Sequence, residues 1–382
     1  MKPSATREIL KVTSQPGMIA FAGGSPDTAA FPCEEVKELS SRILSENPVS
    51  ALVYGVSEGY EPLRVNVKNW LRRNDNIGTE NDSIIITSGG TQVMDLTTRV
   101  LASPGDTIIC EEPSFIGSLN CFRSHGCKLV GVEIDSDGMN IEKLKKAVKE
   151  NPNARFIYTI PNFQNPGGTT LSLEKRKAML EIAKENDLII LEDDPYGKLR
   201  TAGENLPSIK SMDNGENVIY AGSFSKILAP GIRVAFAVVP NKIVPAFTIA
   251  KQVSDVHSGV LNQMIVSRWF DEYDVDGHIS EIRKIYRRKL NLMCDCLDKY
   301  CSDFISYVRP EGGLFIWAKL DDKIDMMKYV KRLLEYKVAV VPGSAFMIDD
   351  TAPCQYIRLN FSTPSDENII KGVKLMADAI NE

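Results

Sequence analysis

Short runs of aliphatic and β-branched residues alternate with helical patterns through the middle of the chain. Such runs between turn-forming residues predict buried strands, and their alternation with helices is typical of βαβ units. Helical periodicity is present at residues 92–101 and 141–149. The predicted strands are residues 83–87, 107–110, 128–132, 155–160, 188–191, 217–221 and 234–239. Together they predict one doubly wound α/β sheet with helices on both faces.

The C-terminal part of the chain follows a different pattern. Residues 282–300 have the periodicity of a long, charged, amphipathic helix, and residues 367–380 that of a closing helix. Shorter strands are predicted between them, at residues 314–319, 338–341 and 356–361. This part therefore predicts a smaller α+β domain. Residues 1–50 are rich in turn formers, and we expect them to join or cross over that domain.

Composition narrows the classes of function. Of the 382 residues, 43% are hydrophobic and 25% are charged, which excludes a disordered or collagen-like protein. The net charge of −5 offers no electrostatic footprint for nucleic acid or an anionic membrane, so neither is expected as a partner. No run approaches the roughly 18 apolar residues of a membrane helix. The first residues also lack the apolar core of a signal peptide.

Histidine and cysteine form no recognisable metal motif. The three histidines, at positions 125, 257 and 278, are far apart in the sequence. Among the eight cysteines there is no Cys-x-x-Cys pair and none beside a histidine at a zinc-ligand spacing. We therefore expect no bound metal, and a cytoplasmic protein with reduced thiols. The cysteines expected to be buried in a helical stretch are Cys294, Cys296 and Cys301.

Small and polar residues follow several predicted strands, at the edge where open α/β sheets bind ligands. Gly89-Gly90-Thr91 opens a helix, so its backbone N–H groups suit a phosphate, although glycine also serves turn geometry alone. Asn165 follows the strand at 155–160, where its side chain either donates to a ligand or forms an Asx turn.

Charged residues follow the next two strands. For Glu192, Asp193 and Asp194, either one carboxylate is paired with a cation in a cleft or all three are solvated at the surface. Lys226 lies between apolar residues, a setting that favours the neutral amine that attacks carbonyl groups. Arg233 offers a guanidinium fork for a phosphate.

These pieces occur as an ordered set of motifs. Residues 223–236 read SFSKILAPGIRVAF, with NPGG at 165–168 and EDDPY at 192–196 before them and YIRLNFS at 356–362 after them. Together they resemble the motifs of the pyridoxal-phosphate-dependent aminotransferases of fold type I, class I/II, whose Schiff-base lysine motif is S-x-S-K-x-x-x-P-G-x-R. The segment GGSPDTAAFP at 23–32 looks most like the aminoadipate/kynurenine-type subgroup, which includes the catalytic halves of GntR-type regulators.

The resemblance implies an architecture. A large cofactor domain at 45–285 would contain a mixed, mostly parallel seven-stranded sheet. A small α+β domain would be assembled from both chain ends, residues 1–44 and 286–382. The segment from Tyr54 to Arg64 resembles the family's Y-x-x-x-x-G-x-x-x-L-R motif, whose tyrosine reaches the phosphate of the neighbouring subunit. The resemblance therefore also implies a homodimer with shared active sites.

The resemblance implies roles for the residues around the cofactor ring. Lys226 would hold pyridoxal phosphate as a Schiff base and move the substrate α-proton. Asp193, three residues before Tyr196, would pair with the pyridinium nitrogen. Tyr196 and Asn165 would hydrogen-bond the phenolic oxygen of the ring, and Phe115 in EEPSFIG would stack on its face.

Phosphate and substrate contacts are implied in the same way. Arg358 would clamp the substrate α-carboxylate bidentately, with Asn165 and Gly24 lining that part of the pocket. Many relatives have Ser-Gln-Gln where this chain has Gly90-Thr91-Gln92, so a side-chain donor is lost at position 90. The residues implied to hold the phosphate are Gly90, Thr91, Ser223, Ser225 and Arg233, with Tyr54 from the other subunit.

The implied activity is transfer of the amino group of an L-amino acid to a 2-oxo acid, such as 2-oxoglutarate, by a ping-pong mechanism. Two alternatives stay open. A carbon–sulfur β-lyase shares the proton abstraction and differs only in pocket details. A non-catalytic ligand-sensing module is disfavoured by the charge of −5 and by the lack of a recognisable winged helix. The sequence does not specify the preferred amino-acid side chain.

Overall fold

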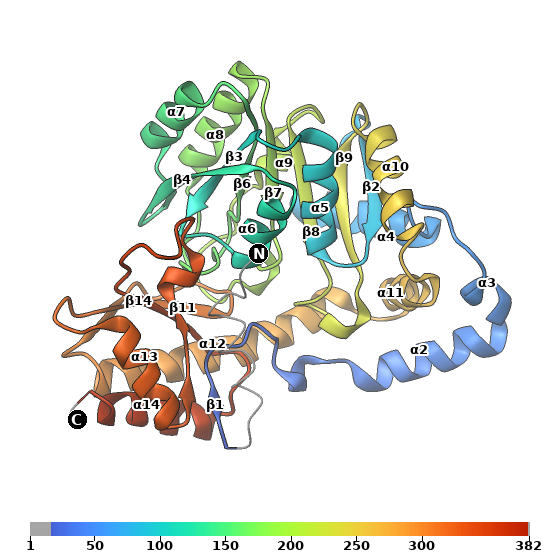
Figure 1. Cartoon of the computed structure of the whole chain (residues 1–382). Coiled ribbons are helices and arrows are strands. Elements are labelled where there is room, and N and C mark those ends of the chain that lie inside the picture. Colours follow the sequence, from blue (N-terminus) through green and yellow to red (C-terminus); the bar gives the residue numbers. More distant parts are fainter. Residues whose placement is uncertain (1–16, 381–382) are drawn as a thin grey trace.

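The computed structural model describes residues 17–380, and its largest element is an eight-stranded sheet (Figure 1). The strand order is β2-β9-β8-β7-β6-β3-β4-β5. Strands β8, β7, β6, β3 and β4 are parallel, whereas β9 is antiparallel to both of its neighbours and β5 is antiparallel to β4. The strands are β2 (Asp82–Thr87), β3 (Thr107–Glu112), β4 (Lys128–Asp135), β5 (Gly138–Met139), β6 (Ala154–Thr159), β7 (Ile189–Asp193), β8 (Val218–Ser223) and β9 (Ala235–Pro240).

All seven strands predicted for the large domain are present in this mixed, mostly parallel sheet. The eighth, β5, was not predicted: Gly138 and Met139 pair with the end of β4 in a tight hairpin. Gly138 has a φ of +104°, and a Cβ there would collide with Leu171, so the turn requires glycine. A strand of two residues is too short to produce a hydrophobic period that sequence analysis can detect.

Helices cover both faces of the sheet (Figure 1). Ile109, Ile157 and Ile190 pack in a hydrophobic cluster with residues of α7, α8 and α9. Their neighbours Ile108 and Leu191 belong to the cluster that includes α5 and α6. Because successive strand residues point to opposite faces, strands that are apolar at every position become central strands. These helices are α5 (Gly90–Leu101), α6 (Ile116–Ser124), α7 (Ile141–Glu150), α8 (Leu173–Glu185) and α9 (Ile209–Met212).

A second, smaller sheet has the order β10-β11-β14-β13 and is antiparallel. The predicted strand at 338–341 is divided here, because β12 pairs with β1 whereas β13 pairs with β14. The N-terminal segment thereby joins the C-terminal part of the chain. The elements are β1 (Ile19–Ala20), β10 (Ile305–Tyr307), β11 (Phe315–Leu320), β12 (Val338–Ala339), β13 (Val341–Pro342), β14 (Tyr356–Asn360), α12 (Val275–Tyr300), α13 (Met326–Glu335) and α14 (Asp366–Asp378).

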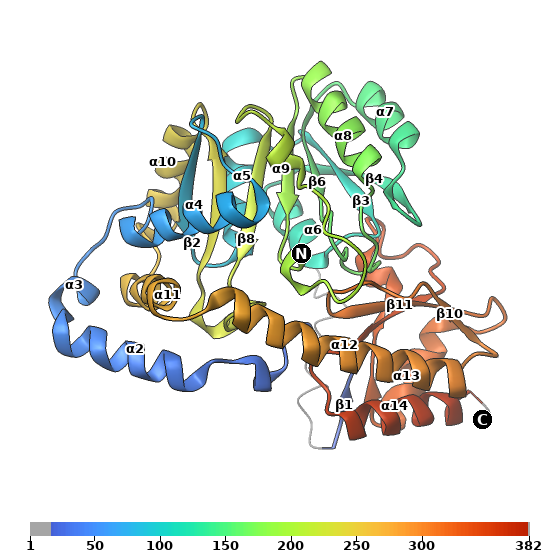
Figure 2. The ribbon, with the colours of Figure 1, turned by 180° about the vertical axis from the view of Figure 1, so that it is seen from behind.

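The helices α2, α3 and α4 in the N-terminal part of the chain were not predicted. Helix α2 buries Leu39 and Ile43 and runs along α11, where Arg268 contacts Glu46 at 2.7 Å (Figure 2). The apolar stripe of α2 was not recognised in the sequence because turn-forming residues lie on either side of the helix. The domain division at 44/45 and 285/286 stays a prediction. The remaining helices are α2 (Cys33–Glu46), α3 (Pro48–Leu52), α4 (Glu61–Asp75), α10 (Val244–Asp255), α11 (Val260–Glu272), η1 (Thr28–Ala30), η2 (Gly197–Leu199), η3 (Pro230–Ile232) and η4 (Gly343–Phe346).

Helix α12 connects the two units. It extends from beside the large sheet to the small one, where it packs against α14 (Figures 1 and 2). Cys294, Cys296 and Cys301 are buried along and just beyond it, as predicted. The N-terminal stretch that lacks the pattern of a signal peptide lies outside the described residues. Within residues 17–380, no helix is both long enough and apolar enough to cross a membrane.

Candidate active site

A pocket of about 340 Å³ lies where the carboxyl ends of β7 and β8 face the small sheet. A volume in this range suits a small cofactor with a substrate. The large unit contributes the starts of α5 and α6, the small unit contributes Phe315, Phe346 and Arg358, and Ala22 and Gly24 come from the N-terminal segment. Every residue predicted for the site except Tyr54 lines this pocket.

Lys226 lies in the first turn after β8. Its Nζ donates a hydrogen bond of 2.7 Å to the carbonyl oxygen of Gly24. Burial, together with the positive charges of Arg358 and Arg233, lowers the pKa of Lys226 to about 8. About a tenth of the side chain is therefore the neutral, nucleophilic amine at pH 7, far more than for a lysine with the ordinary pKa of about 10.4. The apolar setting predicted for this lysine is present, because Phe224, Ile227 and Leu228 are buried.

The three consecutive acids after β7 have separate partners. Glu192 is buried and accepts the N–H groups of Ile209 and Lys210. Asp194 accepts from Gly197 N at 2.9 Å and lies outside the pocket. Asp193 alone lines the pocket, and burial raises its pKa to about 7. The alternative of three solvated surface acids is therefore wrong.

Two hydroxyl groups that sequence analysis missed support Asp193. The buried Tyr158 on β6 donates to Asp193 Oδ2 at 2.9 Å, and Ser118 on α6 donates to Tyr158 at 2.8 Å. The hydrogen bond from Tyr158 counteracts the effect of burial on the pKa of Asp193. The one available signal was the hydroxyl of Tyr158 itself within a predicted buried strand, because a buried hydroxyl needs a hydrogen-bond partner.

Asn165 connects Tyr196 to Arg358. Its Nδ2 donates to the Tyr196 hydroxyl at 3.3 Å, and its Oδ1 accepts from Arg358 Nη1 at 2.9 Å. The side chain is thus oriented toward the pocket, and the Asx-turn alternative is not what the structure shows. The ring of Tyr196 also packs edge-on against Phe315, with ring centres 5.9 Å apart.

Arg358 is a buried cation without a carboxylate partner among the described residues. Its Nη2 donates to Ala22 O at 2.9 Å, and its guanidinium lies 4.1 Å from the ring centre of Phe315 and 4.9 Å from that of Phe346. Its Nε has no partner in the described part of the chain. Burial lowers the pKa of Arg358 to about 10, so the group remains charged at neutral pH and can accept an anion.

The opposite end of the pocket is built to hold an anion. Helix α5 begins there at Gly90, its N-cap Gly89 has a φ of +115°, and no side chain caps the first turn. A Cβ at Gly89 would collide with the Arg233 guanidinium, whereas a Cβ at Gly90 would meet open space. The unpaired N–H groups of the helix start and this guanidinium therefore face a common cavity. The other predicted phosphate ligands that line it are Thr91, Ser223 and Ser225.

Phe115 and Tyr54 have different outcomes. Phe115 is the N-cap residue of α6. A Cβ at position 117 would collide with the Phe115 ring, so Gly117 leaves room for this ring. Tyr54 is 84% exposed and packs edge-on against His257 outside the pocket. Within a single chain, the structure does not bring Tyr54 to the site.

The donor set matches pyridoxal phosphate, with an anion cradle at one end, the Asp193 carboxylate beside the ring position, and Lys226 and Phe115 between them. The fold and this pocket define a pyridoxal-phosphate-dependent enzyme of fold type I. The chain belongs to the aminotransferase class I and II family, whose model matches residues 16–374.

Individual relatives are similar over nearly their whole length. Aromatic-amino-acid aminotransferase 1 of Thermococcus litoralis is 36% identical over 100% of this chain and 92% of its own length. The 2-aminoadipate transaminase of Thermus thermophilus is also 36% identical, with 100% and 94% covered. The crystal structure of Pyrococcus horikoshii kynurenine aminotransferase has a TM-score of 0.95 at 37% identity, with 100% of this chain and 95% of that chain covered.

These relationships confirm the predicted family, fold type, cofactor and activity. The protein is a pyridoxal-phosphate-dependent aminotransferase that acts on amino acids and 2-oxo acids. They support this activity over the β-lyase and the ligand-sensing module.

Proposed function

We propose that Lys226 binds the cofactor covalently through Nζ and then carries the substrate α-proton. The observation that supports this role is the position of a partly deprotonated amine inside the pocket, 2.7 Å from Gly24 O. When bound, pyridoxal phosphate supplies an electron sink for the pair released as the α-C–H bond breaks. The protein's contribution is to place one base beside that bond and to exclude water from it.

The residues around Lys226 would orient and polarise the cofactor ring. Asp193 would hold a proton on the pyridine nitrogen by charge pairing, with Tyr158 fixing the carboxylate. Tyr196 and Asn165 would donate hydrogen bonds to the phenolic oxygen. Phe115 would cover one face of the ring. In this arrangement the negative charge of Asp193 lies at the nitrogen end of the ring, and the hydrogen-bond donors of Tyr196 and Asn165 lie at its phenolic oxygen.

The phosphate would occupy the anion cradle at the start of α5. Gly90 and Thr91 would contribute backbone N–H groups, and the Thr91 hydroxyl a further donor. The hydroxyls of Ser223 and Ser225 and the guanidinium of Arg233 would complete the set. The loss of a side-chain donor at position 90 is thereby compensated by backbone and cationic groups.

Arg358 would bind the α-carboxylate of the amino acid, with Asn165 and Gly24 lining the same end of the pocket. A buried guanidinium that has backbone carbonyls but no carboxylate as partners is an incomplete ion pair. A substrate carboxylate would complete it bidentately and would fix the α-carbon beside Lys226.

Replacing Arg358 with alanine should lower kcat/KM for amino acids by roughly 30- to 1,000-fold, the equivalent of roughly 2–4 kcal/mol for a buried charge pair. Most of the effect should be in KM. Arg200→Ala is a matched control, since Arg200 is also buried over a phenylalanine ring but lies outside the pocket. Steady-state kinetics with an amino acid and with the corresponding amine would separate the roles. An equal loss with both donors would remove Arg358 from carboxylate binding.

We further propose that the preferred amino donors have aromatic or long side chains. Apart from the charged and polar groups, the pocket is lined by large apolar side chains. They are Met94, Phe115, Ile116, Phe315 and Phe346. The names of the similar enzymes point to aromatic, kynurenine and aminoadipate donors. A donor panel with 2-oxoglutarate as acceptor tests this. Phenylalanine, tyrosine and kynurenine should have higher kcat/KM than aspartate or alanine, and a preference for aspartate would contradict the proposal.

We propose that the enzyme is a homodimer in which Tyr54 reaches the phosphate of the neighbouring site. Five large apolar residues are exposed together on α3 and the segment after it. A monomer rarely leaves such a patch uncovered, and a symmetric dimer would cover it. Light scattering of the holoenzyme measures the mass directly, and a monomer would contradict this assignment. The exposed residues are Val49, Leu52, Val53, Tyr54 and Val56.

A cytoplasmic location is proposed from the thiols. All eight cysteines of the chain lie in the described part, and each is a free thiol. Unpaired cysteines in this number fit a reducing compartment.

A further inference from the structure

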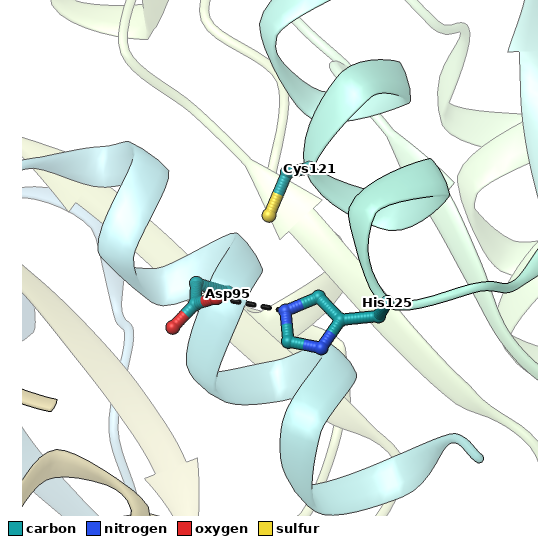
Figure 3. Close-up of side chains that lie close together, drawn as sticks. All are labelled: Asp95, Cys121 and His125. Atoms are coloured by element: carbon teal, nitrogen blue, oxygen red, sulfur yellow. Dashed lines mark hydrogen bonds and ion pairs between the residues drawn. The ribbon is translucent and has the colours of Figure 1, made fainter. Parts of the chain in front are cut away.

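Three side chains with metal-ligating atoms converge between α5 and α6, outside the cofactor pocket. Asp95 comes from α5, Cys121 from α6, and His125 from the C-cap of α6 (Figure 3). Their ligand atoms all lie within 4.8 Å of one another, and His125 Nε2 is 2.7 Å from Asp95 Oδ1. Among residues 17–380, no other group of three such side chains meets this spacing.

Helix geometry explains why these residues meet. Cys121 and His125 are four positions apart, which places them on one face of α6 about one turn apart. That face is turned toward α5, where Asp95 lies (Figure 3). The sequence-based expectation of no metal site depended on cysteine pairs and adjacent histidines. It could not reveal a third ligand supplied by another helix.

The donor types are those that zinc prefers. Thiolate, imidazole and carboxylate are the three common protein ligands of this ion, and three of them leave the fourth tetrahedral position for water. Bonds of about 2.0–2.3 Å require donor atoms about 3.3–3.8 Å apart, so the three atoms need to move by about 1 Å. The side chains of Asp95 and His125 are 28% and 20% exposed, so an ion can enter from solvent.

We propose that Asp95, Cys121 and His125 bind a divalent zinc-type ion. On binding, the Cys121 thiol releases its proton to solvent and forms the sulfur–metal bond, and the His125–Asp95 hydrogen bond is replaced by two bonds to the ion. Helix α5 begins at the anion cradle, and α6 begins directly after Phe115. The ion therefore ties together the two helices whose starts face the pocket, and its role is structural.

Substitution of Arg99 provides a test in which metal binding should become tighter and not weaker. Its Nη2 lies 3.3 Å from Asp95 Oδ2, so it competes with a cation for this carboxylate and repels it. Arg99→Gln should therefore tighten metal binding, whereas substitution of a ligand should weaken it. A role for Asp95 and His125 as a simple hydrogen-bonded pair gives no reason for Arg99→Gln to tighten zinc binding.

The experiment uses chelator-treated holoenzyme that has been freed of chelator and titrated with Zn²⁺ against a zinc indicator. The wild type should bind one equivalent. Cys121→Ser and His125→Gln should each weaken binding at least roughly 100-fold, because loss of an outer-shell partner alone costs roughly 10–100-fold. Cys354→Ser is the matched control, since this thiol is half-buried elsewhere in the chain and should leave binding unchanged.

Two further measurements keep the result interpretable. Co²⁺ in place of Zn²⁺ should give visible bands typical of tetrahedral thiolate coordination, which Cys121→Ser should lose. Metal should raise the melting temperature of the wild type but not that of Cys121→Ser, whose fold is checked by its melting curve without metal. Binding that is absent, or equal in the wild type and both ligand variants, would overturn the site.

Discussion

Replacement of Lys226 with alanine is expected to lower transamination by more than roughly 10⁴-fold. General acid–base catalysis alone contributes roughly 10²–10⁴-fold, and this variant also loses the covalent attachment of the cofactor. The visible absorption of the holoenzyme should change, and borohydride should no longer fix the cofactor to the chain. Peptide mapping of the reduced wild type should find the adduct on Lys226.

Lys242 provides the control for this experiment, because it is an exposed lysine far from the pocket lining. Lys242→Ala should keep both the borohydride adduct and the turnover. A Lys226→Ala protein that retained the adduct and full turnover would show that another amine holds the cofactor. The lowered pKa of Lys226 has a physical cause in burial and in Arg358 and Arg233, whereas Lys242 is exposed to solvent.

The central strands were predictable because a strand that is buried on both faces is apolar at every position of its sequence. The strand at 188–191 is apolar at every position, and the structure places its residues in both hydrophobic clusters. The division of residues 338–341 was not predictable. It depends on β12 finding its partner in β1, over three hundred positions away in the chain, and local pattern carries no information about such pairing.

The site was predictable where chemistry is concentrated in short segments. Lys226, Asp193 and Arg358 each belong to a contiguous motif, and each lines the pocket. Tyr158 and Ser118 were missed because their role exists only once β6, β7 and α6 are packed together. The same reason applies to Asp95, Cys121 and His125, whose spacing in the chain reveals only one helical turn of the arrangement. Residues that act through other side chains can be identified only once the fold is known.

Asp193→Asn is expected to lower transamination by roughly 10³-fold, comparable to the loss of a preorganised electrostatic group. The amide has nearly the same shape as the carboxylate and can still accept the Tyr158 hydrogen bond. It has no charge, however, and cannot hold a proton on the pyridine nitrogen, so the cofactor becomes a weaker electron sink. Single-turnover rates of α-proton removal would measure this directly. An unchanged rate would contradict the assignment of Asp193.

The same substitution should increase the stability of the cofactor-free protein. Burial raises the pKa of Asp193 to about 7, above the value of about 3.9 expected in the unfolded chain. Between these values the folded state holds a proton that the unfolded state has released, so stability falls as pH rises from about 4 to 7. At pH 8 the ionised group costs up to roughly 4 kcal/mol, which asparagine removes.

Urea unfolding of the cofactor-free wild type and Asp193→Asn should therefore differ most at pH 8 and converge below about pH 4. Asp194→Asn is the matched control, since this neighbouring acid lies outside the pocket and accepts from Gly197 N. It should retain activity and gain less stability at pH 8 than Asp193→Asn, because the Asp194 charge is only a minor cause of the raised pKa of Asp193. A cofactor-free Asp193→Asn protein that is less stable than the wild type at pH 8 would show that the buried carboxylate is stabilising. Asp193→Asn is thus expected to lower activity but to raise the stability of the cofactor-free protein. The reason is that the Asp193 carboxylate has a positively charged partner only when the cofactor is bound.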